Sequence, residues 1–457
     1  MSRSKIVFAV LLAGALVPAA RVAGQQLDRE ARVSPRSAVA GPASAAAHGR
    51  KEGGLKLSDV LEALEQRNPR LRAVRSVAAA AAARQPEAST LPDPLFQFGA
   101  MNVGLPDLNA DMAMTMAPSV QVMQMVPFPG KLSLKGDIAE LGTAMAGAGA
   151  EETWWAVRSR ASDLFYKLYA LDRRIEVMRS TLGLLEDFGT VAKAMYSAGT
   201  GRQADVLRAD VEVARMDGEI RKMQALRIAA AARLNALLAR PAETSVPTPV
   251  LGALPLEVPG RDVLTAWAEE SRPVLERGRL GVEQAEARVK LARKDIWPNL
   301  TFGFQYGQRD RGAGTERMGS AIVGFTLPIH AGRRQYAARE EAIAYQRVAE
   351  ADLGDLRAQV GARIDELLAE LGQARSLVRL YRDEVLPQAR ATVESAFSSY
   401  RVGTVDFMTL VDAEMTVNRY EGELYQLLAD YGTAIAALES AVGRPLPESE
   451  RTLAEES

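Results

Sequence analysis

The sequence contains no cysteine, only two histidines and almost no net charge. The absence of cysteine excludes disulfides, thiolate metal sites, a catalytic thiol and a lipidated N-terminal cysteine. With only His48 and His330 in the chain, a histidine-based metal cluster is not expected. Lys and Arg number 56 against 57 Asp and Glu, so no global electrostatic field favours nucleic acid as a partner.

Long apolar runs are also missing from the sequence. Beyond the first residues, no stretch reaches the roughly 18 to 20 uninterrupted apolar residues that a membrane-spanning helix needs. The chain begins with a charged start and the apolar run 6–17, the pattern of a secretory signal peptide that is cleaved after Ala19 or Gly24. We expect a signal peptide at 1–24 and a flexible N-terminus at 25–56, and any membrane crossing must use strands.

One sequence pattern occurs twice, 204 positions apart. Tyr-x-x-Gly-Thr runs from Tyr196 to Thr200 and again from Tyr400 to Thr404. A fixed offset of this length indicates a duplicated unit of domain size rather than a short solenoid repeat. We expect the following divisions: a first repeat at 57–241, a linker at 242–260, a second repeat at 261–446 and a C-terminal tail at 447–457.

Each copy contains two segments in which apolar residues alternate with polar or small ones, as in strands. In the second copy, Phe302, Phe304 and Tyr306 alternate with Gln305 and Gly307. We expect the aromatic side to face lipid and the side of Gln305 and Gly307 to face a lumen. The corresponding segments elsewhere are 96–101, 120–126 and 321–327.

Long helical patterns follow each strand pair. The segment 131–197 contains no proline and would be about 100 Å long at 1.5 Å per residue, and 202–238 runs back along it. From Leu353 to Val385, apolar residues recur every three or four positions, which predicts supercoiled helices packed knobs-into-holes.

The repeated Tyr-x-x-Gly-Thr segment is the tip of a helical hairpin in each copy. Gly199 and Gly403 supply the permissive backbone that reverses the chain. Thr200 and Thr404 are expected to cap the helices that follow.

The strand count sets the architecture. Four strands cannot close a barrel, and an open sheet edge cannot lie in lipid because its backbone groups would be unsatisfied. Three chains would supply twelve strands, an even number within the range of outer-membrane barrels. We expect a mainly α fold with a membrane β-barrel: two tandem repeats with long coiled-coil helical hairpins, whose four strands per chain join a trimeric twelve-strand barrel.

The order of elements, Phe-Pro-Gly-Lys at 128–131, Val-Leu-Pro at 385–387 and the two matched tips resemble the TolC-type outer-membrane efflux factors. Asp93-Pro94, the methionine-rich first loop and Phe-Pro-Gly-Lys look most like the members that serve heavy-metal (cobalt-zinc-cadmium and copper-silver) efflux. The resemblance implies a homotrimer in outer-membrane lipid with a large periplasmic portion, joined to a periplasmic adaptor protein and an inner-membrane pump.

The resemblance implies a passive export duct, with heavy-metal cations as the expected substrate. A duct for drug efflux or type I protein secretion is an alternative within the same fold. A soluble periplasmic coiled-coil scaffold is a further alternative, although it does not explain two strand pairs in register. An enzyme is not expected, because the sequence has no nucleophile-base pair, phosphate loop or metal-ligand spacing.

The resemblance also assigns contact residues at the tips. The family's adaptor contact maps onto Gly199 and Thr200 in the first tip and onto Val402, Gly403 and Thr404 in the second. Ala198 departs from the valine that is usual in the family, so weaker binding is expected at the first tip.

A periplasmic gate is implied near the second tip. In the family's best-known pattern, two aspartates follow the tip glycine by six and nine residues. Here Asp412 holds the ninth place, but Thr409 holds the sixth, and Asp406 or Glu414 could supply substitute charge. The expected gate residues are Tyr400, Arg401, Asp406 and Asp412.

Methionines are frequent around the first strand pair, at positions Met101, Met112, Met114, Met116, Met123 and Met125. Thioethers suit Cu(I), but methionine is more often a flexible apolar filler. His330 lies beside a strand end, where a turn is expected rather than ligation. We therefore assign no metal-binding residue and no cofactor from the sequence.

Overall fold

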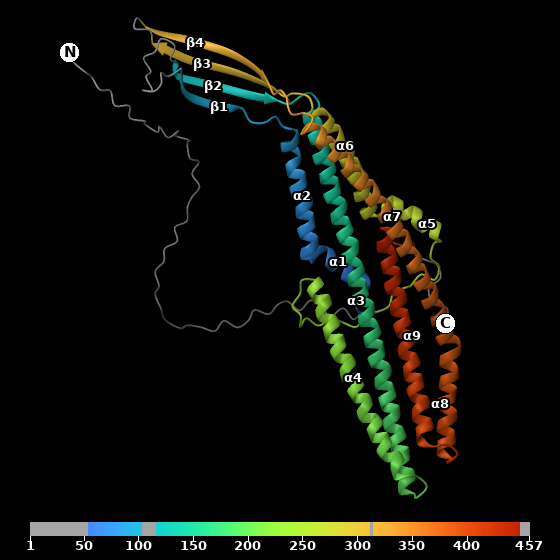
Figure 1. Ribbon diagram of the computed structural model, residues 1–457. Helices are drawn as coiled ribbons and strands as arrows, with labels where there is room; N and C mark the ends of the chain where they lie inside the picture. Colours follow the sequence, from blue (N-terminus) through green and yellow to red (C-terminus); the bar gives the residue numbers. More distant parts are fainter. Residues whose placement is uncertain (1–53, 103–115, 311–313, 448–457) are drawn as a thin grey trace, which may run out of the picture. The chain divides into compact units, whose positions relative to one another are not determined.

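The computed structural model of the protein describes residues 54–102, 116–310 and 314–447 (Figure 1). The expected signal peptide, residues 25–53, Met112, Met114 and almost all of the tail lie outside the described residues. Across the described ranges, no helix is both long enough and apolar enough to cross a membrane.

The first repeat folds into short helices, two strands and two long helices, in the predicted order. Its long helix begins at Lys131 and ends at Ser197, as predicted, because no proline interrupts the segment. The elements of this half are α1 (Leu57–Arg67), α2 (Pro69–Ser89), β1 (Leu95–Met101), β2 (Met116–Val126), α3 (Lys131–Ser197) and α4 (Gln203–Leu237).

The second repeat has the same order, but its long helix is interrupted. Between α7 and α8 the backbone widens into a π-helical turn, η1 (Tyr381–Val385). Pro387 follows and has no N–H to donate to the carbonyl four residues earlier, so the α-helical ladder is broken at this place. The other elements are α5 (Arg261–Ser271), α6 (Pro273–Lys294), β3 (Leu300–Asp310), β4 (Thr315–Phe325), α7 (Gln335–Leu380), α8 (Leu386–Arg401) and α9 (Phe407–Val442).

The four strands form one antiparallel sheet in the order β1-β2-β3-β4 (Figure 1). Paired residues share a face of a sheet, so the register defines its two faces. One row across the strands, on what we call the apolar face, is Phe96, Val122, Phe304 and Ala321. The next row, on the polar face, is Gln97, Gln121, Gln305 and Ser320. The predicted alternation of strand residues is confirmed.

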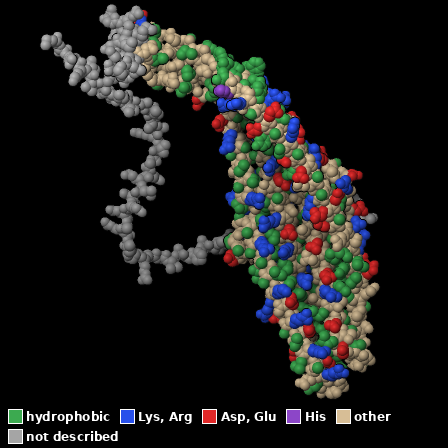
Figure 2. All heavy atoms as spheres, in the orientation of Figure 1, with side chains coloured by type: hydrophobic (Ala, Val, Ile, Leu, Met, Phe, Trp, Pro, Cys, Tyr) green, Lys and Arg blue, Asp and Glu red, His purple; other side chains and the backbone are tan. Residues whose placement is uncertain are grey.

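Large side chains of the apolar face are exposed in a single chain. Phe98 is 78% exposed and Val323 is 70% exposed. In the view of Figure 2, charged side chains are spread over the helices and few lie over the strands. A contiguous apolar surface of this kind marks contact with a membrane or with another protein surface.

Helix α3 is the centre of the helical part. It packs against α2 and α4 of its own repeat and, across the repeats, against α6 and α9. Phe165 and Leu168 of α3 are buried together with Leu367 of α7 and Leu438 of α9. The three- and four-residue spacing predicted for the second repeat corresponds to the buried positions Ile364, Leu367, Leu371, Ala374 and Val378 on α7.

The proline-rich segment between the repeats is part of this core. Leu254 and Leu256 are buried within it. The Tyr431 hydroxyl of α9 donates to the carbonyl of Pro255 at 2.7 Å, and Arg375 of α7 donates to the carbonyl of Leu256 at 3.1 Å. The segment therefore ties helices of the second repeat together.

Gly443 ends α9 in a left-handed conformation, with φ of +81°. A Cβ atom at this position would lie 2.5 Å from the Ser271 carbonyl oxygen, whereas one at Gly403, with φ of +76°, would meet nothing within 4 Å. Each alanine substitution adds left-handed strain of about 1 to 2 kcal/mol. We predict that Gly443→Ala lowers the midpoint of thermal unfolding, followed by circular dichroism, more than Gly403→Ala does. Equal losses would contradict the close approach of α9 to the end of α5.

Candidate functional site

The two hairpin tips have the same backbone geometry. Gly199 and Gly403 adopt φ of +73° and +76°. The Thr200 N–H donates to the Met195 carbonyl, and the Thr404 N–H donates to the Ser399 carbonyl, both at 3.0 Å. The glycine N–H groups donate to carbonyls three residues earlier in the chain. Together, these hydrogen bonds form a Schellman motif at the end of each helix. The expected reversal at both glycines is confirmed.

The tip threonines cap the helices that they follow. The hydroxyls of Thr200 and Thr404 donate to the same two carbonyls as their N–H groups, at 3.1 and 2.9 Å. The prediction that they cap the next helices is wrong, because those helices begin later, with Arg202 and Asp406 as their N-cap residues. A hydroxyl held on the preceding turn stiffens the reversal itself.

The predicted adaptor-contact residues lie at the surface of the tips. Gly199, Thr200, Gly403 and Thr404 are all exposed. Val402 is 74% exposed. Their contact with an adaptor stays a prediction.

A second glycine in the first tip was missed. A Cβ atom on Gly201 would lie 2.8 Å from the backbone nitrogen of Tyr196, so only glycine fits the tight turn there. The equivalent position of the second tip is Val405, which packs on the apolar cluster near the tips. The signal in the sequence is the run Gly-Thr-Gly, which the second copy lacks.

The two tyrosines of the repeated pattern occupy different environments. Tyr196 is 49% exposed, whereas Tyr400 is 3% exposed and stacks edge-on against Phe407, with 5.5 Å between ring centroids. Within the described ranges, the Tyr400 hydroxyl has no hydrogen-bond partner. Burial, followed by the charge of Asp205 in the first turn of α4, raises the pKa of Tyr400. Tyr400 thus joins the second hairpin to the start of the returning helix of the first.

The expected gate residues differ in their contacts and exposure. Asp406 is the N-cap of α9, where its carboxylate accepts from the Thr409 N–H at 2.9 Å and from the Thr409 hydroxyl at 2.7 Å. These hydrogen bonds, followed by the charges of Arg208 and Arg202, lower the pKa of Asp406. Arg401, which lies 6.0 Å from the Phe397 ring centroid, and Asp412 are both exposed. Their role in a gate stays a prediction.

The Phe-Pro-Gly-Lys segment joins the repeats where strands meet helices. The Lys131 ammonium, on a residue only 5% exposed, donates to the Trp297 carbonyl at 2.8 Å and to the Asn299 side chain at 3.1 Å. It also pairs with Asp295 at 3.3 Å. The Phe128 ring stacks on Trp297, with 5.4 Å between centroids. The motif therefore locks β2 and α3 of the first repeat to α6 and β3 of the second.

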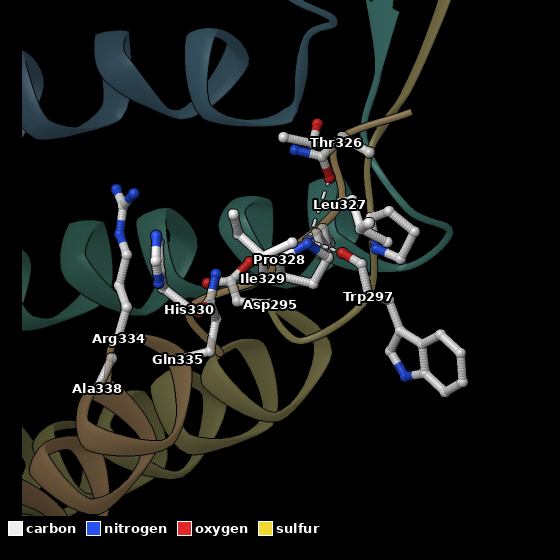
Figure 3. A pocket seen from close by; sticks show the side chains of 13 residues that line it. Asp295, Trp297, Thr326, Leu327, Pro328, Ile329, His330, Arg334, Gln335 and Ala338 are labelled. Atoms are coloured by element: carbon white, nitrogen blue, oxygen red, sulfur yellow. Dashed lines mark hydrogen bonds and ion pairs between the residues drawn. The ribbon is translucent and has the colours of Figure 1, made fainter. Parts of the chain in front are cut away.

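A cavity of about 460 Å³ lies beside this junction, and His330, Arg334 and Asp295 are among the residues that line it (Figure 3). The His330 carbonyl accepts from the N–H groups of Arg333 and Arg334, both at 3.1 Å, so the residue is part of a turn before α7, as expected. In the described part of the chain, no three His, Asp or Glu side chains are grouped so that they could hold a metal ion.

Residues 265–444 match the protein family described as outer membrane efflux protein. This part of the chain is therefore similar to the outer membrane efflux proteins. The match covers most of the second repeat, and the two Tyr-x-x-Gly-Thr segments relate the first repeat to the second.

Individual relatives and solved structures are similar to a larger part of the chain. The cobalt-zinc-cadmium resistance protein CzcC of Cupriavidus metallidurans is 21% identical over 336 residues, which cover 72% of this chain and 78% of that protein. The outer-membrane channel OprN superposes with a TM-score of 0.72 at 21% identity, over 85% of this chain and 89% of that chain. CusC superposes with a TM-score of 0.73 at 14% identity, over 85% and 92% of the two chains. The predicted TolC-type fold is confirmed.

Glu414, one of the two residues that could supply substitute charge near the second tip, is buried. It is 4% exposed, between α3 and α9. The Thr181 hydroxyl of α3 donates to its carboxylate at 3.4 Å, and Asn418 donates to the Thr181 oxygen at 3.0 Å. Burial raises the pKa of Glu414, the Thr181 hydrogen bond opposes the shift, and the charge of Glu421 adds to it. This burial could not be predicted from local sequence, because Glu414 lies only two positions from the exposed Asp412.

The buried Glu414 makes the stability of the helical part depend on pH. Because its pKa in the folded protein is above the ordinary 4.5, Glu414 contributes stability below pH 4.5 that is lost as the pH rises through the folded pKa. We predict that Glu414→Gln, neutral at every pH, gains stability relative to the wild type as the pH rises above 4.5. Thermal unfolding at a series of pH values measures this, with the exposed Glu394→Gln as control. A constant difference between wild type and Glu414→Gln would contradict the shift.

Proposed function

We propose that the chain is the outer-membrane channel subunit of a tripartite efflux system, a passive duct that carries heavy-metal cations from a pump and an adaptor across the periplasm and the outer membrane. The observation that carries the proposal is the combination of two helical hairpins with matched glycine-threonine tips and a four-strand sheet with one exposed apolar face. The match of residues 265–444 to the family described as outer membrane efflux protein supports it.

The sheet supports assembly as a homotrimer. Strands β1 and β4 are the two edges of the sheet, so each has one unpaired side. In lipid those backbone groups need partners, which a neighbouring copy supplies when β4 of one chain pairs with β1 of the next. Three copies give twelve strands, an even number suited to an outer-membrane barrel with the apolar face toward lipid.

The helices support a periplasmic conduit. Helix α3 has 67 residues, which correspond to about 100 Å at 1.5 Å per residue. In this arrangement the tips are at the far end of the tube from the barrel, and we assign Gly199, Thr200, Val402, Gly403 and Thr404 to contact with a periplasmic adaptor protein. An inner-membrane pump completes the system. The repeats at 57–241 and 261–446, with the linker at 242–260, are the units of this proposal.

The cargo is assigned from the relative and from the acidic tip. The relative CzcC is described as a cobalt-zinc-cadmium resistance protein. Exposed Asp412, repeated three times around a symmetry axis, would make the periplasmic end of the duct favourable for cations. Neither observation requires a catalytic residue or a cofactor.

Gene deletion combined with cell fractionation tests the proposal. We expect a trimer that detergent extracts from the outer membrane, and a deletion strain that loses tolerance to heavy-metal salts and keeps its tolerance to drugs. Release of the protein by osmotic shock would contradict a membrane channel. Loss of drug tolerance alone would keep the channel and replace the cargo.

The two faces of β4 provide a matched test of the barrel. Ala321 pairs with Phe304 on the apolar face, and its neighbour Ser320 pairs with Gln305 on the polar face. Both are small and exposed. We predict that Ala321→Lys costs about 2 to 4 kcal/mol near the bilayer midplane and lowers the yield of membrane trimer, whereas Ser320→Lys is tolerated. Equal yields would mean that the apolar face does not meet lipid.

A substitution of Asp412 tests the proposed gate. Three carboxylates near a threefold axis repel one another, so removing their charge should change ion selectivity more than stability. We predict that Asp412→Asn trimers in a planar bilayer lose part of their cation preference and of their block by multivalent cations from the periplasmic side. Asp187→Asn, which removes an exposed charge from α3 near the same end, is the control. Unchanged selectivity would assign Asp412 to the outside of the tube.

A further inference from the structure

The methionines of the described strands share one face of the sheet. Met123 and Met125 follow Gln121 at even spacing on β2, and Met318 precedes Ser320 by two residues on β4, so all three lie on the polar face. The Met101 sulfur contacts the Gln305 side-chain amide, and the Met116 side chain lies over Gly307, which also belongs to this face. Methionines that only fill apolar space would instead be expected on the apolar face or in the helical core.

Three of these methionines lie around Gln305 and Gly307 of β3. Met101 and Met116 are directly paired between β1 and β2, and Met318 is directly paired with Gly307 between β3 and β4. The Met116 sulfur lies 3.1 Å from the point that a Cβ atom of Gly307 would occupy. The missing side chain at Gly307 leaves the space in which thioethers from both sides can meet. Met101 and Met116 are directly opposite each other, and such residues have Cβ atoms about 4.5 to 5.5 Å apart, whereas Met318 would reach them across Gly307 from β4.

The chemistry of this cluster selects one class of ion. Thioether sulfur is a soft, uncharged donor, which favours Cu(I) over the borderline Zn²⁺ and over hard cations. The charged neighbours on the same face are Arg309 and Glu316, which are directly opposite each other and form an ion pair. They therefore add no excess charge that would attract a divalent ion.

We propose that Met101, Met116 and Met318 form a three-thioether binding site for a soft monovalent cation, Cu(I) or its heavier analogue Ag(I), on the polar face of the sheet. The proposal rests on the proposed function only for its place on the export route, because that function makes the polar face the lining of the duct. Three neutral ligands hold the ion without charge compensation, so it can exchange onward, as conduction through a channel requires.

Titration of the full-length protein in detergent with Ag(I), which needs no reductant, tests the site by calorimetry and by the NMR shifts of methionine methyl groups. We expect one Ag(I) per chain and shifted methyl signals from Met101, Met116 and Met318. The triple variant Met101→Leu, Met116→Leu, Met318→Leu keeps side-chain volume and should lose at least about tenfold in affinity. The control Met123→Leu, Met125→Leu removes two thioethers from the same face and should bind as the wild type does.

A single substitution provides the second variant in case the triple variant does not assemble. Gly307→Ala leaves every sulfur in place but puts a methyl group 3.1 Å from the Met116 sulfur, so it should weaken Ag(I) binding. Wild-type affinity in either the triple variant or Gly307→Ala, or equal loss in the control, would overturn the site.

The outcome is separable from that of the proposed function. If Ag(I) binds as expected but deletion of the gene leaves metal tolerance unchanged, the site stands and the proposed function fails. If deletion removes metal tolerance but the purified protein binds no Ag(I), the site fails and the proposed function stands. A deletion strain complemented with the triple variant should regain tolerance to zinc and cadmium salts and stay sensitive to copper and silver salts.

Discussion

Apolar packing along one helix holds this protein together. A helix of 67 residues cannot be stable in water by hydrogen bonding alone, and α3 acquires its stability from the helices on its sides. Phe165 and Leu168 pack in one buried cluster with residues of α7 and α9. Phe188 packs in a second cluster, near the tips, with Met216, Tyr400 and Leu410. Because both clusters contain residues of both repeats, the duplicated halves form one folding unit. Neither hairpin has a complete core by itself.

The duplication gives two hairpins, and the two differ in structure. The first has an uninterrupted long helix and an exposed Tyr196, whereas the second has a π-helical turn before Pro387 and a buried Tyr400. The widened turn leaves a weakened place in the second hairpin, held by the hydrogen bond of Tyr381 to Glu423 at 2.6 Å. Motion at the tips would therefore bend the second hairpin there, while the first stays straight.

Much of this architecture follows from sequence because it depends on local periodicity. The alternation around Phe304, the proline-free run of α3 and the two tip glycines each determine a backbone form within a few residues. Features that depend on contacts between distant segments could not be read in this way. Glu414 is buried because Thr181 faces it from α3, and the Lys131 ammonium is held by groups more than 160 residues away. The tip threonines were also assigned to the wrong helix, because a threonine hydroxyl at this position could cap either the preceding or the following helix.

The methionines show that a binding site, like a buried contact, can depend on segments that are distant in the sequence. Their number in the sequence does not distinguish filler from ligand, because the two uses need the same residue type. The register across four strands decides, since it brings Met101, Met116 and Met318 around a glycine on the face that carries glutamines and serine. In the proposed duct, with Asp412 carboxylates at the periplasmic end and the proposed thioether site in the barrel, cations would be attracted where charge is strongest. The duct would then pass soft ions through a region that recognises them without holding them by charge.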